Sequence, residues 1–254
     1  MDLSFRVREL FHLHTLRQLA ARLALRPYAV KGGICLRFFH RSPRLSEDMD
    51  IDVSPRLPVR TLRHTVDQLL GGPAIIAGLR PRGIVGLQFS TPKQTETTQR
   101  WKILLTLAGG ATLSTRLEFS RRATEIDAER STPTPEILEM AFLPPFVAAH
   151  YGPTEMAAQK IRALGSPSRV AARDLFDLHH LYSQSPGTSF QKIGDLTSEE
   201  FEKALEKVKC FSLRDFREQV LPFLPEDLEN LYGDPAGFQT MKERVEQHLA
   251  KALL

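Results

Sequence analysis

The stretch "KGGICLRFFHRSPRLSEDMDID" (Lys31–Asp52) opens with two glycines and closes with three aspartates at every second position. Acidic and apolar residues alternate over Met49–Val53, which predicts a β-strand with one polar face. Asp48, Asp50 and Asp52 then share that face at steps of roughly 7 Å. Carboxylates at this spacing repel one another unless a cation offsets their charge. Two interpretations stay open on these residues alone: a site for a hard divalent cation such as Mg²⁺, or a solvated strand at a sheet edge.

The two glycines favour the first interpretation. Gly32 and Gly33 follow a short predicted strand, Tyr28–Val30, and precede a predicted helix that starts with "ICLRFF". A backbone without side chains can approach a phosphate closely, and the amides at a helix N-terminus can bind it. Alone, such a pair indicates no more than a tight turn. The order strand, Gly-Gly, helix, loop and Asp-x-Asp strand is a more specific arrangement than any of its parts.

This order resembles the nucleotidyltransferase β superfamily, and its residues resemble more narrowly the AbiEii/AbiGii toxin family of bacterial nucleotidyltransferases. That family carries a Lys-Gly-Gly turn followed by Arg-x-Ser-x-Asp-hydrophobic-Asp. The matching residues are Lys31, Gly32, Gly33, Arg44, Ser46, Asp48 and Asp50. A second block, "EMAAQKIRALGSPSRVAARDLFDLHHL" (155–181), is also similar to the family pattern. Its matching residues are Glu155, Lys160, Ala163, Leu164, Arg173, Asp174, Asp177 and Leu178. The resemblance spans about residues 1–182.

The resemblance implies an enzyme that uses Mg²⁺ or Mn²⁺ and an NTP as substrate. Asp48 and Asp50 are then the catalytic metal ligands. The superfamily usually adds a third carboxylate from a neighbouring strand, and Glu118 is the best-placed candidate. It alternates with Leu117 and Phe119, so it faces away from the core that they fill. A solvent-facing acid on a strand is the other interpretation of Glu118, and Asp52 is expected to be peripheral.

The remaining site residues are implied by the same resemblance. The nucleotide-binding set comprises Lys31, Gly32, Gly33, Arg44, Ser46 and Asp177, and the catalytic set adds Lys160 and Asp174 to the two metal ligands. Lys160 can act as a point charge for a triphosphate, and Arg44 can bind phosphate bidentately. Asp174 and Asp177 stand three residues apart on a predicted helix and share a face. A solvated lysine and a structural ion-pair network are the alternatives.

The fold class predicted for the chain is α+β. A nucleotidyltransferase-like mixed sheet flanked by helices is expected over residues 1–150, followed by an all-helical half, 151–254, that contributes the Lys/Asp motif to the active-site cleft. Strands are predicted at 83–90, 100–107 and 115–122, and helices at 3–25, 59–70, 155–164 and 170–182. Thr197 with Glu200 and Ser212 with Asp215 resemble capping boxes.

Composition limits the function classes only weakly. The 254 residues carry a formal net charge of +4, which suits a polyanionic partner without requiring one. Cys35 and Cys210 predict neither a disulfide framework nor a metal cluster, and favour reduced thiols in the cytoplasm. The N-terminal segment lacks the uninterrupted apolar run of a signal peptide or membrane span. Adjacent histidines on a helix, His179 and His180, point about 100° apart, so surface or packing roles are expected for them rather than a shared ion.

The function that the resemblance implies is transfer of an NMP from an NTP to an RNA acceptor, a tRNA 3′ end, by the toxin of a type IV-like toxin–antitoxin system. A cognate antitoxin is then an expected partner, and no membrane is involved. One alternative is a binding module with a degenerate site, and another is a metal-dependent nuclease whose carboxylates activate water. The paired glycines and Lys160 suit a triphosphate and favour transfer.

Overall fold

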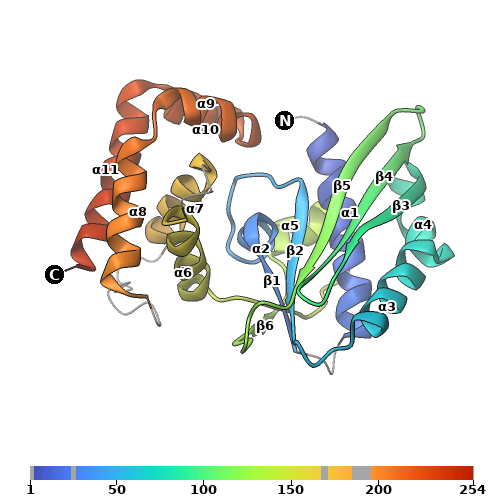
Figure 1. Cartoon of the computed structure of the whole chain (residues 1–254). Helices are drawn as coiled ribbons and strands as arrows, with labels where there is room; N and C mark the ends of the chain where they lie inside the picture. The colour runs from blue at the N-terminus through green and yellow to red at the C-terminus, as the bar shows by residue number, and fades with distance from the viewer. Residues whose placement is uncertain (1–2, 24–26, 167–170, 185–195, 254) are drawn as a thin grey trace. The chain divides into compact units, whose positions relative to one another are not determined.

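The computed structural model describes residues 3–23, 27–166, 171–184 and 196–253, and the chain divides into two compact units (Figure 1). The α/β unit contains the chain up to Arg41 and the segment Ser46–Tyr151. The helical unit contains the segment Ser42–Leu45 and the chain from Gly152 onward. A mixed sheet with flanking helices and a helical C-terminal half confirm the α+β prediction.

A seven-stranded sheet is formed by the described residues of the α/β unit, in the order β3-β4-β5-β2-β1-β7-β6. The strands are β1 (Tyr28–Lys31), β2 (Asp48–Val53), β3 (Ile84–Gln94), β4 (Thr98–Leu107), β5 (Thr112–Ser120), β6 (Glu129–Ser131) and β7 (Ala148–His150). Strand β2 pairs in parallel with β5 and antiparallel with β1, while β1 pairs in parallel with β7. The acidic strand β2 is therefore a central strand and not an edge strand.

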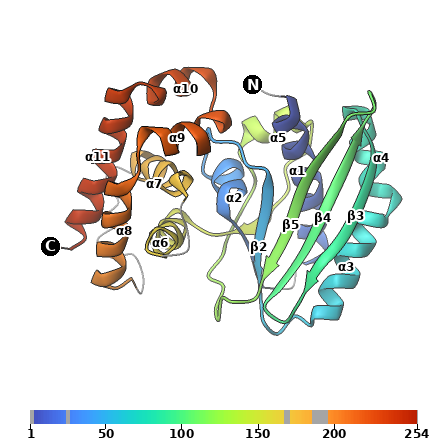
Figure 2. The same ribbon diagram turned by 45° about the horizontal axis from the view of Figure 1, so that its top comes forward.

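The helices of the α/β unit bury one face of this sheet. They are α1 (Leu3–Arg22), α2 (Gly32–Phe39), α3 (Val59–Gly71), α4 (Pro73–Leu79) and α5 (Pro135–Ala141), with a 3₁₀ turn, η1 (Arg80–Arg82). Figures 1 and 2 show α1, α3 and α4 together along one face of β3, β4 and β5. Met49, Ile51, Trp101, Leu117 and Phe119, which alternate with the polar residues of their strands, are completely buried. Burial of each such side chain contributes about 1.5–3 kcal/mol.

Helix α1 begins at Leu3, as predicted, and ends at Arg22. The last two residues of the predicted helix, Ala24 and Leu25, lie outside the described part of the chain. Four polar residues of α1 are buried: Glu9, His12, His14 and Thr15. Glu9 accepts a hydrogen bond of 2.6 Å from Arg37 Nε, and His12 Nε2 lies 2.7 Å from Thr115 Oγ1. Burial, with a smaller effect of Arg8, lowers the pKa of His12 to about 3.

The helical unit is built around α7 (Ala172–Gln184), which is buried nearly all round. The other elements are α6 (Pro153–Leu164), α8 (Ser198–Cys210), α9 (Leu213–Gln219), η3 (Leu221–Phe223), α10 (Glu226–Gly233) and α11 (Pro235–Lys251). Helices α6, α9 and α11 pack against α7. No described helix is both long and apolar enough to span a membrane.

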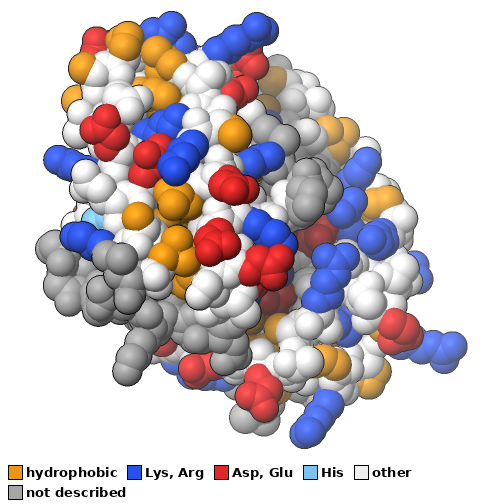
Figure 3. All heavy atoms as spheres, turned by 60° about the vertical axis from the view of Figure 1, so that its left-hand side comes forward, with side chains coloured by type: hydrophobic (Ala, Val, Ile, Leu, Met, Phe, Trp, Pro, Cys, Tyr) orange, Lys and Arg blue, Asp and Glu red, His pale blue; other side chains and the backbone are white. Residues whose placement is uncertain are grey.

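Several local predictions for this unit are confirmed. Both capping boxes form, with reciprocal hydrogen bonds between Thr197 and Glu200 and between Ser212 and Asp215. His179 and His180 are buried packing residues. The predicted "GSPS" turn begins with Gly165 and Ser166 after α6, while Pro167 and Ser168 lie outside the described residues. Acidic and basic side chains are interspersed on the face seen in Figure 3, which is typical of a solvated surface.

Candidate active site

Two neighbouring strands of the α/β unit, β2 and β5, carry carboxylates on the polar face of the sheet. Strand β2 presents Asp48 and Asp50 on this face, and the parallel register sets Asp50 beside Glu118 of β5. Neighbouring strands lie about 4.8 Å apart, so Asp50 and Glu118 are direct neighbours across the two strands. Glu118 is partly exposed, whereas Leu117 and Phe119 are buried, as the alternation in the sequence predicts. Asp48, Asp50 and Glu118 therefore share one face of the sheet.

Two arginines on the same face compensate these carboxylates. Arg116 Nη2 lies 2.7 Å from Asp48 Oδ2, and Arg100 Nη2 lies 2.6 Å from Glu118 Oε2. The side chains of Asp48 and Arg116 are 34% and 36% exposed, so water screens their attraction. Such pairs contribute about 0–1 kcal/mol and can exchange partners. Sequence reasoning did not identify either arginine, because the register of β2, β4 and β5 brings them to the carboxylates.

Gly32 is required by a close approach of Asp50. It begins α2 with a φ of +69°, which disfavours any residue with a side chain. A Cβ atom at this position would lie 3.2 Å from Asp50 Oδ2. The predicted glycine turn is thus the first turn of α2 itself, and Gly32 and Gly33 place backbone amides at that helix N-terminus next to a carboxylate of the acidic strand.

Lys31, which immediately precedes Gly32, is tied to the third aspartate of the strand. Its Nζ atom lies 2.6 Å from Asp52 Oδ1, and Tyr151 Oη donates to Asp52 Oδ2 at 3.0 Å. Asp52 is buried and fully engaged by these two groups, while 26% of the Lys31 side chain is exposed. Asp52 therefore positions Lys31, a role that the sequence did not indicate.

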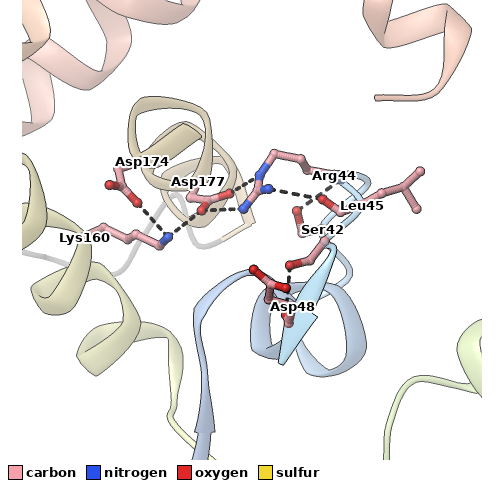
Figure 4. A network of polar contacts seen from close by, with 8 residues as sticks. Ser42, Arg44, Leu45, Asp48, Lys160, Asp174 and Asp177 are labelled. Carbon is pink, nitrogen blue, oxygen red and sulfur yellow. Dashed lines mark hydrogen bonds and ion pairs between the residues drawn. The ribbon is translucent and has the colours of Figure 1, made fainter. Parts of the chain in front are cut away.

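The second motif forms a buried network inside the helical unit (Figure 4). Lys160 Nζ lies 2.8 Å from Asp174 Oδ1 and 2.6 Å from Asp177 Oδ2. Arg44 donates two hydrogen bonds to the Asp177 carboxylate, from Nε to Oδ1 at 2.8 Å and from Nη2 to Oδ2 at 2.9 Å. All four side chains are buried, so two cations and two carboxylates neutralise one another away from water. The structure brings Arg44, Lys160, Asp174 and Asp177 together from three segments of the chain.

The network fixes the ionisation of its members. Burial opposes the charged ammonium of Lys160, but Asp174 and Asp177 outweigh it and raise the pKa of Lys160. Burial likewise opposes the Asp177 carboxylate, but Arg44 and Lys160 outweigh it and hold the pKa of Asp177 far below its usual range. The charges of Lys160 and Asp177 therefore persist at neutral pH.

Arg44 belongs to a short segment, Ser42–Leu45, that packs with the helices. Arg44 Nη1 donates to the Leu45 carbonyl at 3.1 Å, and the Leu45 amide donates to the Phe223 carbonyl at 2.8 Å. Ser46, the next residue along the chain, belongs to the α/β unit and donates its hydroxyl to the Asp48 carbonyl at 3.3 Å. The site residues predicted from the sequence thus form two groups, one in each unit.

Comparisons with known proteins identify the family to which the chain belongs. A family model described as "Nucleotidyl transferase AbiEii toxin, Type IV TA system" matches residues 14–251, well beyond the 1–182 of the sequence resemblance. No curated protein sequence matches the chain.

Three solved structures share its fold at low identity. A candidate nucleotidyltransferase from H. pylori has a TM-score of 0.60 and 16% identity, and the match covers 100% of this chain and 96% of that one. JHP933 from Helicobacter pylori has a TM-score of 0.56 and 17% identity, covering 99% and 95%. MenT4, a nucleotidyltransferase toxin from Mycobacterium tuberculosis H37Rv, has a TM-score of 0.58 and 18% identity, covering 96% and 82%. At such identities the likeness shows the fold.

Proposed function

Because this chain belongs to the AbiEii family of nucleotidyltransferase toxins, we propose that it transfers an NMP from an NTP to the 3′ end of an RNA, a tRNA in particular, with Mg²⁺ or Mn²⁺ as cofactor. The single observation that carries the proposal is the register of β2 and β5, which sets Glu118 beside Asp50 on the face that also presents Asp48. The family membership supplies the reaction type, and the three carboxylates supply its metal ligands.

The donor set fits a hard divalent ion. Asp48, Asp50 and Glu118 offer only oxygen atoms, which Mg²⁺ and Mn²⁺ prefer over softer ligands. Their arginine partners are part-exposed and can be displaced by a bound cation at little cost. When bound, divalent ions neutralise the triphosphate and stabilise charge at both ends of an in-line displacement. In that displacement the acceptor hydroxyl oxygen attacks the α-phosphorus while the bond to pyrophosphate breaks.

We assign the triphosphate to the residues at the start of α2. The backbone amides of Gly32 and Gly33 can donate hydrogen bonds to phosphate oxygens at the helix N-terminus, and Lys31 beside them is held in place by Asp52. Ser46 is assigned to the same nucleotide-binding set through its position two residues before Asp48. Arg100 and Arg116, once released from the carboxylates, are cations that can bind phosphate oxygens bidentately.

The buried network acts on the reaction through position in this proposal. The charge of Lys160 is already neutralised, because its Nζ atom lies less than 3 Å from a carboxylate oxygen of both Asp174 and Asp177. A phosphate that contacts Lys160 would therefore compete with these two carboxylates. Arg44 is anchored by the network, and only Leu45, Ser46 and Glu47 separate it from Asp48 along the chain. Loss of the network is therefore expected to disturb the segment that leads into the metal-binding strand.

The partners follow from the family and from charge. A net charge of +4 is compatible with an RNA acceptor, and toxins of this family imply a cognate antitoxin protein. We place this activity in the cytoplasm, where NTPs, tRNA and reduced thiols occur together.

The test is incubation of the purified protein with Mg²⁺, total tRNA and each α-³²P-labelled NTP in turn. Wild type should label RNA with one preferred NTP, and Asp50→Ala should not. Asp127→Ala, which removes an exposed aspartate of the same unit, is the matched control and should label as wild type does. Shortened, unlabelled RNA would indicate the nuclease, and no turnover on RNA or protein acceptors would indicate a binding module.

A further inference from the structure

A cysteine and two histidines converge in the α/β unit, apart from the carboxylates of the proposed active site. Cys35 lies in α2, His40 caps the C-terminus of that helix, and His150 ends β7. One ligand atom from each residue lies within 4.8 Å of the other two. Cys35 and His150 are buried and His40 is half-buried, so the cluster is built into the core with one side open to solvent.

The three side chains converge on one backbone atom, the Tyr151 carbonyl oxygen. His40 Nε2 lies 2.8 Å from it, His150 Nδ1 lies 3.0 Å from it, and Cys35 Sγ lies 3.5 Å from it. A carbonyl oxygen has two lone pairs, so at most two of these three groups can donate to it at once. The three ligand atoms lie within 4.8 Å of one another, close enough for one cation to draw them together.

Ser131 supplies the outer partner that a metal-binding histidine requires. Its Oγ atom lies 2.7 Å from His150 Nε2 and donates to the Thr132 carbonyl at 3.4 Å. A hydroxyl has a single proton, so with that proton on Thr132 it accepts from His150 Nε2–H. His150 Nδ1 then presents a lone pair toward the cluster. Metal-bound histidines almost always donate their other ring N–H in this way.

We propose that Cys35, His40 and His150 form a binding site for Zn²⁺. A thiolate and two imidazoles are ligands that zinc prefers, whereas Mg²⁺ prefers oxygen. Zinc–ligand distances of about 2.3 Å to sulfur and 2.0–2.1 Å to nitrogen bring tetrahedral ligand atoms to about 3.3–3.7 Å from one another. The three ligand atoms, which lie within 4.8 Å of one another, would therefore draw together on binding. The Cys35 thiol releases its proton on binding. A fourth position remains beside half-buried His40, where water can complete a tetrahedron.

The site would join two elements that the proposed reaction needs. Helix α2 starts with the glycines assigned to phosphate, and β7 is paired in parallel with β1 through Val30 and His150. Phe39 stacks on the His150 ring with centroids 4.1 Å apart, which fixes the ring orientation. Zinc at this site is therefore expected to stabilise the α/β unit and to hold the C-terminal end of α2.

The test uses the reduced full-length protein and Co²⁺ as a spectroscopic substitute for Zn²⁺. Wild type should bind one equivalent, with a sulfur-to-cobalt charge-transfer band and visible bands of a tetrahedral ion, and Zn²⁺ but not Mg²⁺ should displace it. Cys35→Ser should abolish the charge-transfer band and weaken Zn²⁺ binding at least about 10-fold, and Ser131→Ala should weaken it about 10- to 100-fold. Cys210→Ser, which removes the exposed thiol, is the matched control and should keep the wild-type spectrum.

Other results would overturn the proposal. An unchanged band in Cys35→Ser, or loss of the band in Cys210→Ser, would place the metal elsewhere. Loss of cobalt in Asp50→Asn would place it on the carboxylates of the active site. If Cys35→Ser does not fold, His40→Gln tests the proposal instead. This variant changes a half-buried ligand, and its Co²⁺ spectrum should lose the visible bands of a tetrahedral ion; unchanged bands would overturn the proposal. Each readout is independent of nucleotidyl transfer, so its outcome is separate from that of the proposed function.

Discussion

The carboxylates of β2 and those of α7 are the same chemical groups in opposite states. Asp48 is about one-third exposed and is paired with an arginine that water can replace. Asp177 has no exposed side-chain surface and is bound at once by Arg44 and Lys160. A part-exposed pair contributes about 0–1 kcal/mol, whereas breaking a buried one costs about 3–5 kcal/mol. The strand carboxylates are therefore part-exposed and weakly paired, whereas the helix carboxylates are buried and strongly paired.

The largest expected effect separates the two groups by activity. Asp50→Asn should lower nucleotidyl transfer about 1,000-fold or more, because several kcal/mol of transition-state stabilisation by bound metal are lost. Its melting temperature should stay close to that of wild type. The measurement is RNA labelling beside thermal unfolding. Full activity in Asp50→Asn would show that the Asp50 carboxylate has no role in the reaction.

The converse substitution lies in α7. Asp177→Asn keeps the shape of the side chain but leaves Arg44 and Lys160 with a single buried counter-charge, so unfolding free energy should fall by about 3–5 kcal/mol. Urea unfolding measures it. The matched variant Asp48→Asn should change stability by less than about 1 kcal/mol, because its pair with Arg116 is screened by water. An equal loss of unfolding free energy in Asp177→Asn and Asp48→Asn would contradict the difference between the buried and the part-exposed carboxylates.

The two units differ in the burial of their carboxylates but not in that of their histidines, because each unit buries at least one neutral histidine. Burial lowers the pKa of His12 to about 3 and that of His179 to about 4, from an ordinary value of 6.5. The unfolded chain then binds more protons than the folded chain below pH 6.5, so stability is lost as pH falls from 6.5 to about 4. His12 can contribute up to about 1.4 kcal/mol for each pH unit in that window.

Unfolding at a series of pH values tests this dependence. His12→Gln should flatten the slope between pH 6.5 and 4, whatever its effect on stability at neutral pH. Exposed His64 provides the control, and His64→Gln should leave the slope unchanged. Asp177 acts only at lower pH, because its depressed pKa makes its stabilisation complete above about 3.8. An unaltered slope in His12→Gln would show that His12 titrates equally in both states.

The smallest expected effect concerns the exchange of partners at Asp48. Arg116→Gln removes a cation that competes for this carboxylate, so Mg²⁺ binding without nucleotide should strengthen by about 2- to 5-fold, equivalent to about 1 kcal/mol or less. Titration calorimetry at low salt measures it, and 0.5 M salt should erase the difference through screening. Weaker Mg²⁺ binding in Arg116→Gln would mean that the arginine organises the site.

Local patterns in the sequence determined a good part of the fold. The alternation over Met49–Val53 placed the acidic face of β2, and the alternation around Glu118 placed that residue away from the core. Capping boxes at Thr197 and Ser212 marked the starts of two helices. These features depend on residues a few positions apart, and local backbone preferences are enough to fix them. Helix α4, and the three-residue strands β6 and β7, carry too little periodicity to be predicted this way.

The tertiary structure alone decided which of these residues meet. Arg100 reaches Glu118 only through the register of β4 and β5, and Arg44 reaches Asp177 across 133 positions of sequence. Two cysteines by themselves predicted no metal site, yet the fold sets Cys35 beside His40 and His150. Such pairings depend on strand register and helix packing, which long-range burial of apolar surface determines. The sequence by itself therefore determined the chemical groups and the faces that carry them, and the packed structure decided their partners and their exposure to water.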